Sequence, residues 1–171
     1  MITFTKPRAL QRGDPVGVFD CGVASLNSWF RTLALRNQQA GASRTFVTIA
    51  DDSSIAGYYS LSSFTISRDA AGALGAGLPD PIPVTLIGRL AVDERFTGRG
   101  LGVSLLQDAA LRAVQVSLQV GSAAIVVHTQ NETVTPFYER FGFVRLNGDR
   151  RTLILPMADA LATVEGLRDK P

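Results

Sequence analysis

The sequence predicts an α/β (α+β) fold in which helices cover a mixed sheet. Of the 171 residues, 46% are hydrophobic, which is enough to build a buried core and argues against disorder. Some segments repeat apolar residues at helical spacing, whereas others are short runs of β-branched and apolar residues. The two kinds of segment follow one another without internal repeats or a domain linker, so we expect one domain over residues 1–171.

The first part of the chain predicts a helix followed by a β-hairpin. Residues 20–25 are typical of a turn that leads to a helix, with Ser25 as its N-cap and Gly41 after its end. The apolar stripe of this helix, which we expect to lie in the core, consists of Leu26, Trp29, Phe30 and Leu33. β-Branched and aromatic residues predict strands over 45–50 and 55–66, joined by a turn.

The rest of the chain predicts a loop and then alternating strands and helices. Residues 70–83 are small and bounded by proline, which is typical of a mobile loop. After it we expect, in order, a strand over 84–92, a loop over 93–100, a helix over 101–118, a buried strand over 122–129, a short helix over 133–140, a strand over 151–155 and a closing helix over 156–167.

Composition excludes several classes of protein. The single cysteine, Cys21, cannot form an internal disulfide, which fits a reducing compartment. With one histidine, His128, far from Cys21 in sequence, the chain argues against a Cys–His nucleophile and against a zinc site, and we expect no metal. No segment contains about 20 consecutive apolar residues, the length that a helix needs to span a bilayer. The N-terminus lacks the apolar stretch of a signal peptide. We therefore expect a cytoplasmic protein that does not associate with a membrane.

The positive charge of the chain is almost entirely arginine. The net charge of +2 does not by itself indicate nucleic acid, but Lys6 and Lys170 are the only lysines. Arg31, Arg36 and Arg44 lie in a stretch without acidic residues. Arginine can grip a phosphate with two parallel bonds. Two interpretations stay open: phosphate contacts, or an ordinary solvated face in a protein of arginine-rich composition.

A glycine-rich turn between a strand and a helix predicts a diphosphate site. Gly98, Gly100 and Gly102 let backbone N–H groups approach a ligand, and the first amides of the helix lack internal partners. Arg95 and Arg99 add positive charge. The spacing matches neither the P-loop of nucleotide triphosphatases nor the dinucleotide motif G-x-G-x-x-G. A purely structural turn is the alternative.

Two motifs resemble those of the GNAT (Gcn5-related N-acetyltransferase) superfamily. Residues 95–100 match its [Q/R]-x-x-G-x-[G/A] loop, and residues 131–138 match its N-x₆-Y motif, followed by Gly142-Phe143. The resemblance covers about residues 46–155. It implies a mixed, mostly antiparallel central sheet flanked by helices, with acetyl-CoA as co-substrate. The residues that it assigns to the coenzyme are Leu90, Ala91, Val92, Arg95, Gly98, Arg99, Gly100, Leu101, Gly102 and Asn131.

In this resemblance Tyr138 is the general acid that protonates the departing coenzyme A thiolate. A phenol has an ordinary pKa of about 10 and is therefore protonated at neutral pH. The alternative is that Tyr138 is a core aromatic, and Asn131 is either a pantetheine contact or a helix cap. No general base stands out among Glu94, Glu132 and Glu139. An amine with a pKa near about 8 needs little help from one.

The N-terminal region resembles one branch of the superfamily. The segments F-D-C-G-x-x-S-L-N over 19–27 and A-S-R-T-F over 42–46 are similar to TacT- and AtaT-type toxins of toxin–antitoxin systems. This resemblance implies acetylation of the α-amino group of aminoacyl-tRNA, which halts translation. It also implies a cognate antitoxin, a small DNA-binding protein, and a homodimer. Arg36, Arg44 and Arg89 are the expected tRNA contacts.

The sequence leaves two other functions open. The chain is alternatively a GNAT enzyme that acts on a small-molecule amine or on a protein N-terminus. A site for a cationic small amine should be acidic, whereas the N-terminal region is basic. The third hypothesis is a non-catalytic module that binds coenzyme A or another anion. Loss of acetyl transfer without the Tyr138 hydroxyl would distinguish the enzyme from this module.

Overall fold

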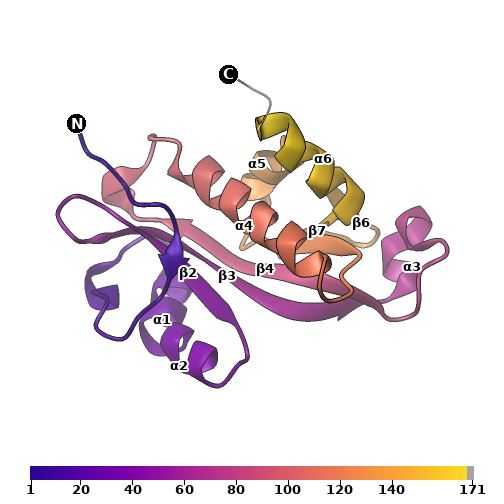
Figure 1. Ribbon diagram of the computed structural model, residues 1–171, viewed down its shortest axis with the longest axis horizontal. Coiled ribbons are helices and arrows are strands. Elements are labelled where there is room, and N and C mark those ends of the chain that lie inside the picture. The colour runs from indigo at the N-terminus through magenta and orange to yellow at the C-terminus, as the bar shows by residue number, and fades with distance from the viewer. Residues whose placement is uncertain (169–171) are drawn as a thin grey trace. The chain divides into compact units, whose positions relative to one another are not determined.

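The computed structural model describes residues 1–168. Its strands form a seven-stranded mixed sheet in the order β1-β2-β3-β4-β5-β7-β6, flanked by helices (Figure 1). The strands are β1 (Arg8–Ala9), β2 (Arg44–Ile49), β3 (Ile55–Ile66), β4 (Ile82–Val92), β5 (Ala124–His128), β6 (Val144–Leu146) and β7 (Asp149–Pro156). The α-helices are α1 (Ala24–Thr32), α2 (Ala34–Gln39), α3 (Arg68–Ala71), α4 (Leu101–Ser117), α5 (Thr135–Glu139) and α6 (Met157–Arg168). The predicted fold class is confirmed.

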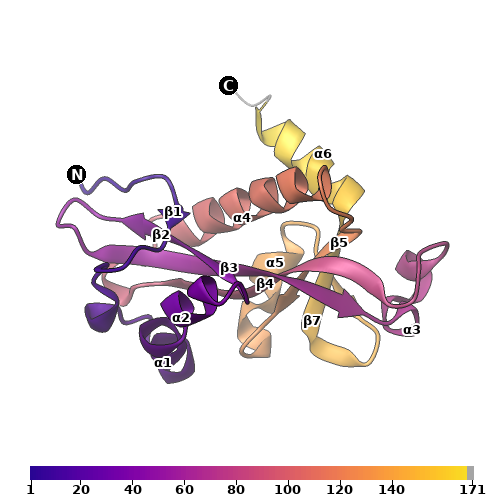
Figure 2. The same cartoon turned by 60° about the horizontal axis from the view of Figure 1, so that its bottom comes forward.

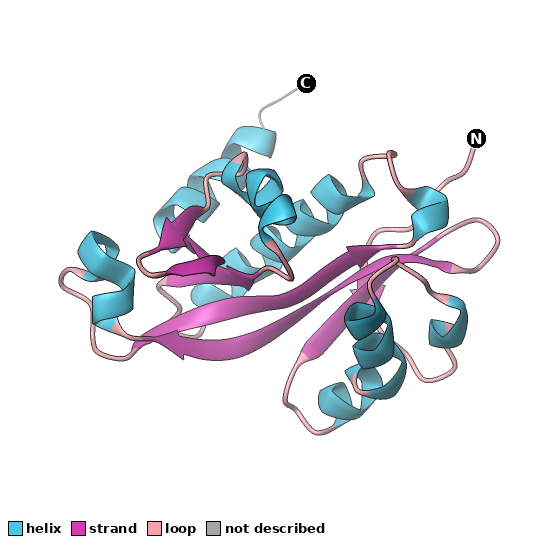
Figure 3. Cartoon of the chain, turned by 180° about the vertical axis from the view of Figure 1, so that it is seen from behind, coloured by secondary structure: helices cyan, strands magenta, loops and turns pink. Residues whose placement is uncertain are grey.

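The chain divides into two compact units whose segments alternate along the sequence. The first unit contains Met1–Ser62 and Gly88–Asp108, and the second contains Ser63–Ile87 and the chain from Ala109 onward. The long strands β3 and β4, which are drawn in magenta in Figure 3, and the helix α4 therefore contribute residues to both units. The single domain over residues 1–171 stays a prediction.

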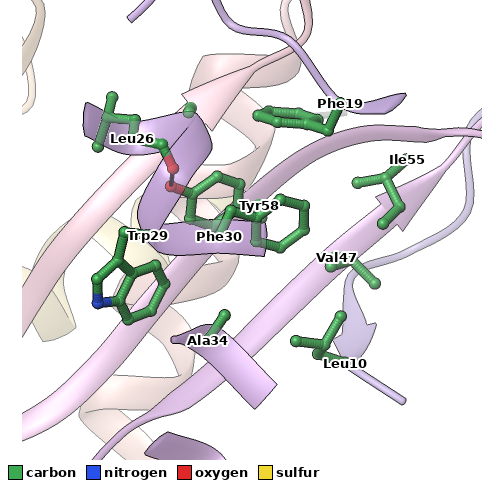
Figure 4. Close-up of a cluster of buried hydrophobic side chains, with 10 residues drawn as sticks. Leu10, Phe19, Leu26, Trp29, Phe30, Ala34, Val47, Ile55 and Tyr58 are labelled. Atoms are coloured by element: carbon green, nitrogen blue, oxygen red, sulfur yellow. Dashed lines mark hydrogen bonds between the residues drawn. The ribbon is translucent and has the colours of Figure 1, made fainter. Parts of the chain in front are cut away.

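In the first unit, an antiparallel sheet is covered on one face by α1 and α2 (Figure 2). Aromatic residues build its core, because the Phe30 ring stacks on Tyr58 with centroids 4.0 Å apart. Phe19 packs edge-on against both rings. The Tyr58 hydroxyl donates to the carbonyl oxygen of Leu26 at 3.0 Å (Figure 4). Trp29 is 7% exposed in the same core, as predicted.

In the second unit, β5 lies between a parallel and an antiparallel neighbour. It pairs with β4 at Thr85–Ile87 and with β7 along its whole length. Because both of its faces are covered, its residues Ile125, Val126 and Val127 are all buried, as their continuous apolar run predicts. Val126 joins a core cluster with residues of β3, β4 and β7.

Several predicted elements differ from the structure. The helix that we expected to end near Gly41 is two helices, α1 and α2, which meet at Leu33. Val23 and not Ser25 occupies the N-cap of α1, and it makes no side-chain cap. The short strands β1 and β6 were not predicted, because two or three residues are too few to show a period.

The segment expected as a loop over residues 70–83 carries regular structure. It overlaps α3, a 3₁₀ turn over Gly72–Gly75 and the start of β4. Ser67 caps α3 by accepting a hydrogen bond from the Ala70 amide at 3.1 Å. Arg68 fixes the far side of the segment, since its guanidinium donates to the carbonyl oxygen of Leu78 at 3.2 Å. The prediction of a mobile loop was therefore wrong, because these capping and side-chain hydrogen bonds hold the segment in short helical turns.

Within residues 1–168, none of the helices has the length and apolar character needed to cross a membrane.

Candidate active site

The glycine-rich turn between β4 and α4 has the backbone geometry of an anion site. Gly98 and Gly100 both adopt the left-handed region, with φ of +74° and +78°. No heavy atom lies within 4 Å of where a Cβ would stand at either residue, so the backbone conformation, and not space, requires glycine. The amides that begin α4 at Leu101 follow directly, and such amides favour anions.

A buried carboxylate holds the start of this turn. Asp93 is 1% exposed and caps a 3₁₀ turn over Glu94–Phe96 by accepting from the Arg95 amide at 3.0 Å. Its carboxylate also accepts from Nε of Arg95 at 2.9 Å and from Nη2 at 3.1 Å. Burial raises the pKa of Asp93, but the bonds from Arg95 and from the Asp20 amide outweigh burial and hold that pKa below its usual range.

This ion pair changes the expected part of Arg95. Its guanidinium fork is engaged by Asp93, so its charge is shared with a carboxylate and its first effect is to fix the turn. Arg99 is exposed in the middle of the turn. Phosphate contacts of Arg95, Gly98, Arg99, Gly100, Leu101 and Gly102 stay predictions.

The end of β4 lies close to β3. A Cβ on Gly57 of β3 would stand 3.0 Å from the carbonyl oxygen of Ala91 and 2.8 Å from a methyl group of Leu105, so glycine permits this approach. Ala91 is buried, whereas Leu90 and Val92 are half-buried. Backbone pairing of Leu90, Ala91 and Val92 with a pantetheine arm stays a prediction.

Tyr138, in the second unit, is a packed side chain with a protonated hydroxyl. It is 7% exposed on α5, and its ring lies 5.1 Å from Phe137 and 5.8 Å from Phe143 between centroids, edge-on to both. Burial raises the pKa of Tyr138 to about 12. The ring therefore belongs to a core, and the phenol keeps its proton at neutral pH, as a general acid requires.

Asn131 caps a turn that precedes α5. Its Oδ1 accepts from the Thr133 amide at 2.9 Å and from the Thr133 hydroxyl, and it begins a 3₁₀ turn over Glu132–Val134. The capping interpretation is thus confirmed. A pantetheine contact of Asn131 stays a prediction.

Side chains that could act as bases or nucleophiles are poorly placed for these tasks. Glu94, Glu132 and Glu139 are exposed, and Glu139 pairs with Arg145 at 3.1 Å. Burial raises the pKa of the Cys21 thiol, which disfavours the reactive thiolate. In residues 1–168, no group of three or more His, Cys, Asp or Glu side chains could hold a metal ion.

Three arginines of the first unit are candidates for phosphate contacts. The guanidinium of Arg89 lies 4.1 Å from the centroid of the Trp29 ring. Burial lowers the pKa of Arg89, and no carboxylate of the described residues pairs with it. Arg36 on α2 and Arg44 at the start of β2 are exposed. By contrast, Arg31 is engaged, since its Nη2 donates to the carbonyl oxygen of Phe19 at 2.6 Å.

The segments that carry Arg36 and Arg44 are tied together. Gln38 of α2 donates through Nε2 to the carbonyl oxygen of Leu10 at 2.8 Å, and its Oε1 accepts from the Thr45 amide at 3.0 Å. Contact of Arg36, Arg44 and Arg89 with tRNA stays a prediction.

The sequence interpretation missed the polar residues that support the glycine turn. Asp93 stands directly before it, Asp20 of the N-terminal segment bonds to Asp93, and Asn27 bonds to Asp20. An acid two residues before an arginine, at a strand end, is the sequence signal of a capped turn and could have identified Asp93. The partners Asp20 and Asn27 are distant in sequence, so only the fold reveals them.

Comparison with known proteins agrees with this arrangement. The profile described as "Acetyltransferase (GNAT) family" matches residues 15–143. The tRNA-acetylating toxin of Mycobacterium tuberculosis is 40% identical over 165 residues, which cover 96% of this chain and 99% of that protein.

Solved structures of similar proteins have the same fold. AtaT complexed with acetyl-methionyl-tRNAfMet has a TM-score of 0.82 and 26% identity, and the match covers 98% of this chain and 99% of that one. A Tyr-to-Phe mutant of the toxin AtaT, bound to the C-terminus of the antitoxin AtaR and to acetyl-CoA, has a TM-score of 0.78 and 27% identity, covering 95% and 97%.

The family match spans most of the chain, and the mycobacterial relative matches it almost from end to end. This chain therefore belongs to the acetyltransferase (GNAT) family and is an N-acetyltransferase that uses acetyl-CoA.

Proposed function

We propose that this acetyltransferase is a toxin that acetylates the α-amino group of aminoacyl-tRNA and so prevents its use in translation. The observation that carries the proposal is the 40% identity to a tRNA-acetylating toxin over 96% of this chain and 99% of the relative. The structural match to AtaT in complex with acetyl-methionyl-tRNAfMet supports it.

The glycine turn is assigned to the diphosphate of acetyl-CoA. Left-handed Gly98 and Gly100 and the first amides of α4 form the cradle. Arg99 supplies an exposed charge, and Arg95 fixes the turn through Asp93. Leu90, Ala91 and Val92 pair their backbone with the pantetheine arm, and Asn131 contacts the same arm from its capped turn.

Tyr138 is assigned as the general acid. Attack of an amine on the thioester gives a tetrahedral intermediate, which collapses to the amide and expels a thiolate that must be protonated. The Tyr138 phenol, whose pKa burial raises to about 12, reaches this step with its proton in place. A thiolate expelled into a buried environment is itself desolvated, which raises the pKa of its thiol in the same direction. Burial therefore shifts the pKa of the acid and the pKa of the leaving group in the same direction.

An aminoacyl ester needs little help from a protein base. A free α-amino group has a pKa of about 8, and an adjacent ester lowers it further. A large fraction of the amine is then already neutral at the pH of a cell. The exposure of Glu94, Glu132 and Glu139 is consistent with an enzyme that leaves this deprotonation to the solvent.

The basic residues of the first unit are assigned to the tRNA. Arg36 and Arg44 are exposed on segments that hydrogen bonds of Gln38 connect. The guanidinium of Arg89 is held in place by its stacking on the Trp29 ring. Contacts of this kind to phosphates position an RNA without reading its sequence. The cognate antitoxin would be a small DNA-binding protein, the toxin a homodimer, and the cytoplasm its place of action, where aminoacyl-tRNA is found.

Acetyl transfer from labelled acetyl-CoA tests the proposal directly. The acceptors are total charged tRNA, the same tRNA after deacylation, a panel of small amines and a peptide with a free N-terminus. Label should enter charged tRNA alone and be released as an N-acetylamino acid when the ester is hydrolysed. Label only on small amines or on the peptide would establish the alternative acceptors, and no transfer at all would favour a binding module.

Growth provides an independent test. Expression of the wild-type chain alone should arrest bacteria, and Tyr138→Phe should relieve the arrest at equal protein levels. Growth of cells that contain active wild-type enzyme would contradict a toxin.

A further inference from the structure

The segment over residues 19–27, which carries the polar side chains of Asp20 and Asn27, has no part in the chemistry assigned above. We propose that this segment, the N-terminal brace (residues 19–27), positions the diphosphate-binding turn and thereby sets the affinity for acetyl-CoA. The inference rests on the proposed coenzyme role of the turn over residues 95–102. It assigns Asp20 and Asn27 as positioning residues, which act through Asp93 and Glu94.

The brace grips the start of the turn at two adjacent residues. The Asp20 amide donates to Oδ2 of Asp93 at 3.1 Å, and the Asp20 carbonyl oxygen accepts from the Glu94 amide at 2.9 Å. Asp93 in turn holds both the backbone and the guanidinium of Arg95. The position of Asp20 therefore passes through Asp93 to the residues that lead into Gly98.

A second set of bonds fixes Asp20 itself. Its Oδ1 accepts from the Gly22 amide at 2.8 Å and from Nδ2 of Asn27 at 2.8 Å. Asn27 is 8% exposed, and its Oδ1 accepts from the Cys21 amide at 3.0 Å and from the Cys21 thiol at 3.2 Å. One buried amide on α1 thus satisfies both ends of the brace turn, with its donor on Asp20 and its acceptor on Cys21.

The brace is anchored in the core by its first residue, Phe19, and lies against Glu94 at Gly22. Phe19 is fully buried against Phe30 and Tyr58, and its carbonyl oxygen accepts from Arg31 at 2.6 Å. At the other side, Gly22 has a φ of +80°, and a Cβ there would stand 2.3 Å from Oε1 of Glu94. Glycine at this position therefore lets the brace lie directly against the residue that follows Asp93.

The Asn27–Asp20 bond allows a sharp test. Asn27→Asp keeps the size of the side chain but places a second carboxylate against Asp20 and removes the donor. The affinity of the full chain for coenzyme A, measured by calorimetry, should fall about tenfold, in the usual range for coupling between sites. The KM for acetyl-CoA should rise with it, while kcat at saturating acetyl-CoA changes by less than about twofold.

Two further variants separate positioning from general loosening. Asn37→Asp adds the same charge on α2, where no bond of the brace is involved, and should bind coenzyme A like the wild type. The exchanged pair Asp20→Asn with Asn27→Asp restores one amide and one carboxylate and should recover most of the lost affinity. An exchanged pair that binds no better than Asn27→Asp would overturn the brace.

Hydrogen exchange on the unmodified chain requires no substitution. Coupling is reciprocal, so saturating coenzyme A should slow exchange of the Cys21, Gly22 and Glu94 amides. Unchanged exchange there, or wild-type affinity in a folded Asn27→Asp variant, overturns the brace alone. A wild-type chain that does not bind coenzyme A overturns the turn assignment, and the brace with it.

Discussion

Arg89 stacks on Trp29, with its guanidinium carbon 4.1 Å from the centroid of the indole ring. The stack holds a half-buried cation that no carboxylate among residues 1–168 neutralises. Burial lowers the pKa of Arg89, but a guanidinium starts so far above neutrality that it stays charged. A cation already ordered on an aromatic face loses little freedom when it binds a phosphate.

Arg89 should therefore contribute to tRNA affinity by charge and by shape. For Arg89→Gln we expect weaker binding of all aminoacyl-tRNAs and a slope of log Kd against log salt that is smaller by about one. Arg89→Lys should keep the slope but still lose affinity, because lysine lacks the planar fork. Fluorescence anisotropy over a salt series measures both. Arg145→Gln, which removes an exposed arginine already paired with Glu139, is the control and should leave the slope unchanged.

Tyr138→Phe should remove the proton donor and keep the packing. A phenyl ring retains the edge contacts with Phe137 and Phe143, so we expect coenzyme affinity and melting temperature near those of the wild type. Turnover should fall roughly 10²- to 10⁴-fold, the usual contribution of a positioned acid. Steady-state kinetics and calorimetry separate the two quantities.

Tyr58→Phe is the matched control for Tyr138→Phe. It deletes a hydroxyl that donates to the carbonyl oxygen of Leu26, and it should cost about 1 kcal/mol of stability. Turnover per folded molecule should stay at the wild-type level. Equal losses of turnover in the two variants would contradict the acid role of Tyr138.

The main elements of the fold could be predicted because the pattern of their apolar residues is typical of a strand or of a helix. β5 is a continuous apolar run, and α4 repeats apolar residues at helical spacing. The break between α1 and α2 could not be predicted, since Leu33 has no helix-breaking side chain, although its φ of −118° departs from the helical value of about −63°. The two-residue β1 exists because β2 offers it an edge, which is a tertiary effect.

The candidate site divides along the same line. Gly98 and Gly100 were predictable from the sequence, because a positive φ restricts the choice of residue. The Asp93 partner of Arg95 was not predicted, because the sequence interpretation assigned the arginine to phosphate alone; that phosphate contact stays a prediction beside the ion pair. The spacing of residues 19–27 does not predict a contact with residue 93, which lies about seventy residues later in the sequence.

Gly100→Ala should separate backbone strain from coenzyme binding. A Cβ meets no atom within 4 Å, so the cost is that of a left-handed alanine, about 1–2 kcal/mol. Relief of that strain moves the turn, and coenzyme A affinity should fall at least about tenfold. Gly77→Ala has nearly the same φ, +77°, and the same open space, but lies outside the turn. It should lose similar stability in chemical unfolding and bind coenzyme A normally; equal binding by both variants would contradict the cradle.

Because the pKa of Asp93 is lowered in the folded chain, part of the free energy of unfolding depends on pH and is lost in acid. Because Asp93 binds a proton less readily in the folded chain than in the unfolded one, its contribution is complete above the ordinary carboxyl pKa of about 4. As the pH falls further, through the lowered folded pKa, the contribution is lost. The free energy of unfolding of the wild type should therefore decrease below about pH 4.

Asp93→Asn tests this origin, since an amide does not titrate. The variant should be less stable than the wild type at neutral pH, because Arg95 loses its ionic partner. It should also show a shallower decrease of the unfolding free energy below about pH 4, as measured by urea denaturation at a series of pH values. Asp159→Asn, which changes an exposed carboxylate on α6, should keep the wild-type slope. If Asp93→Asn kept that slope as well, the acid sensitivity would arise from other carboxylates, and the Asp93–Arg95 pair would not carry it.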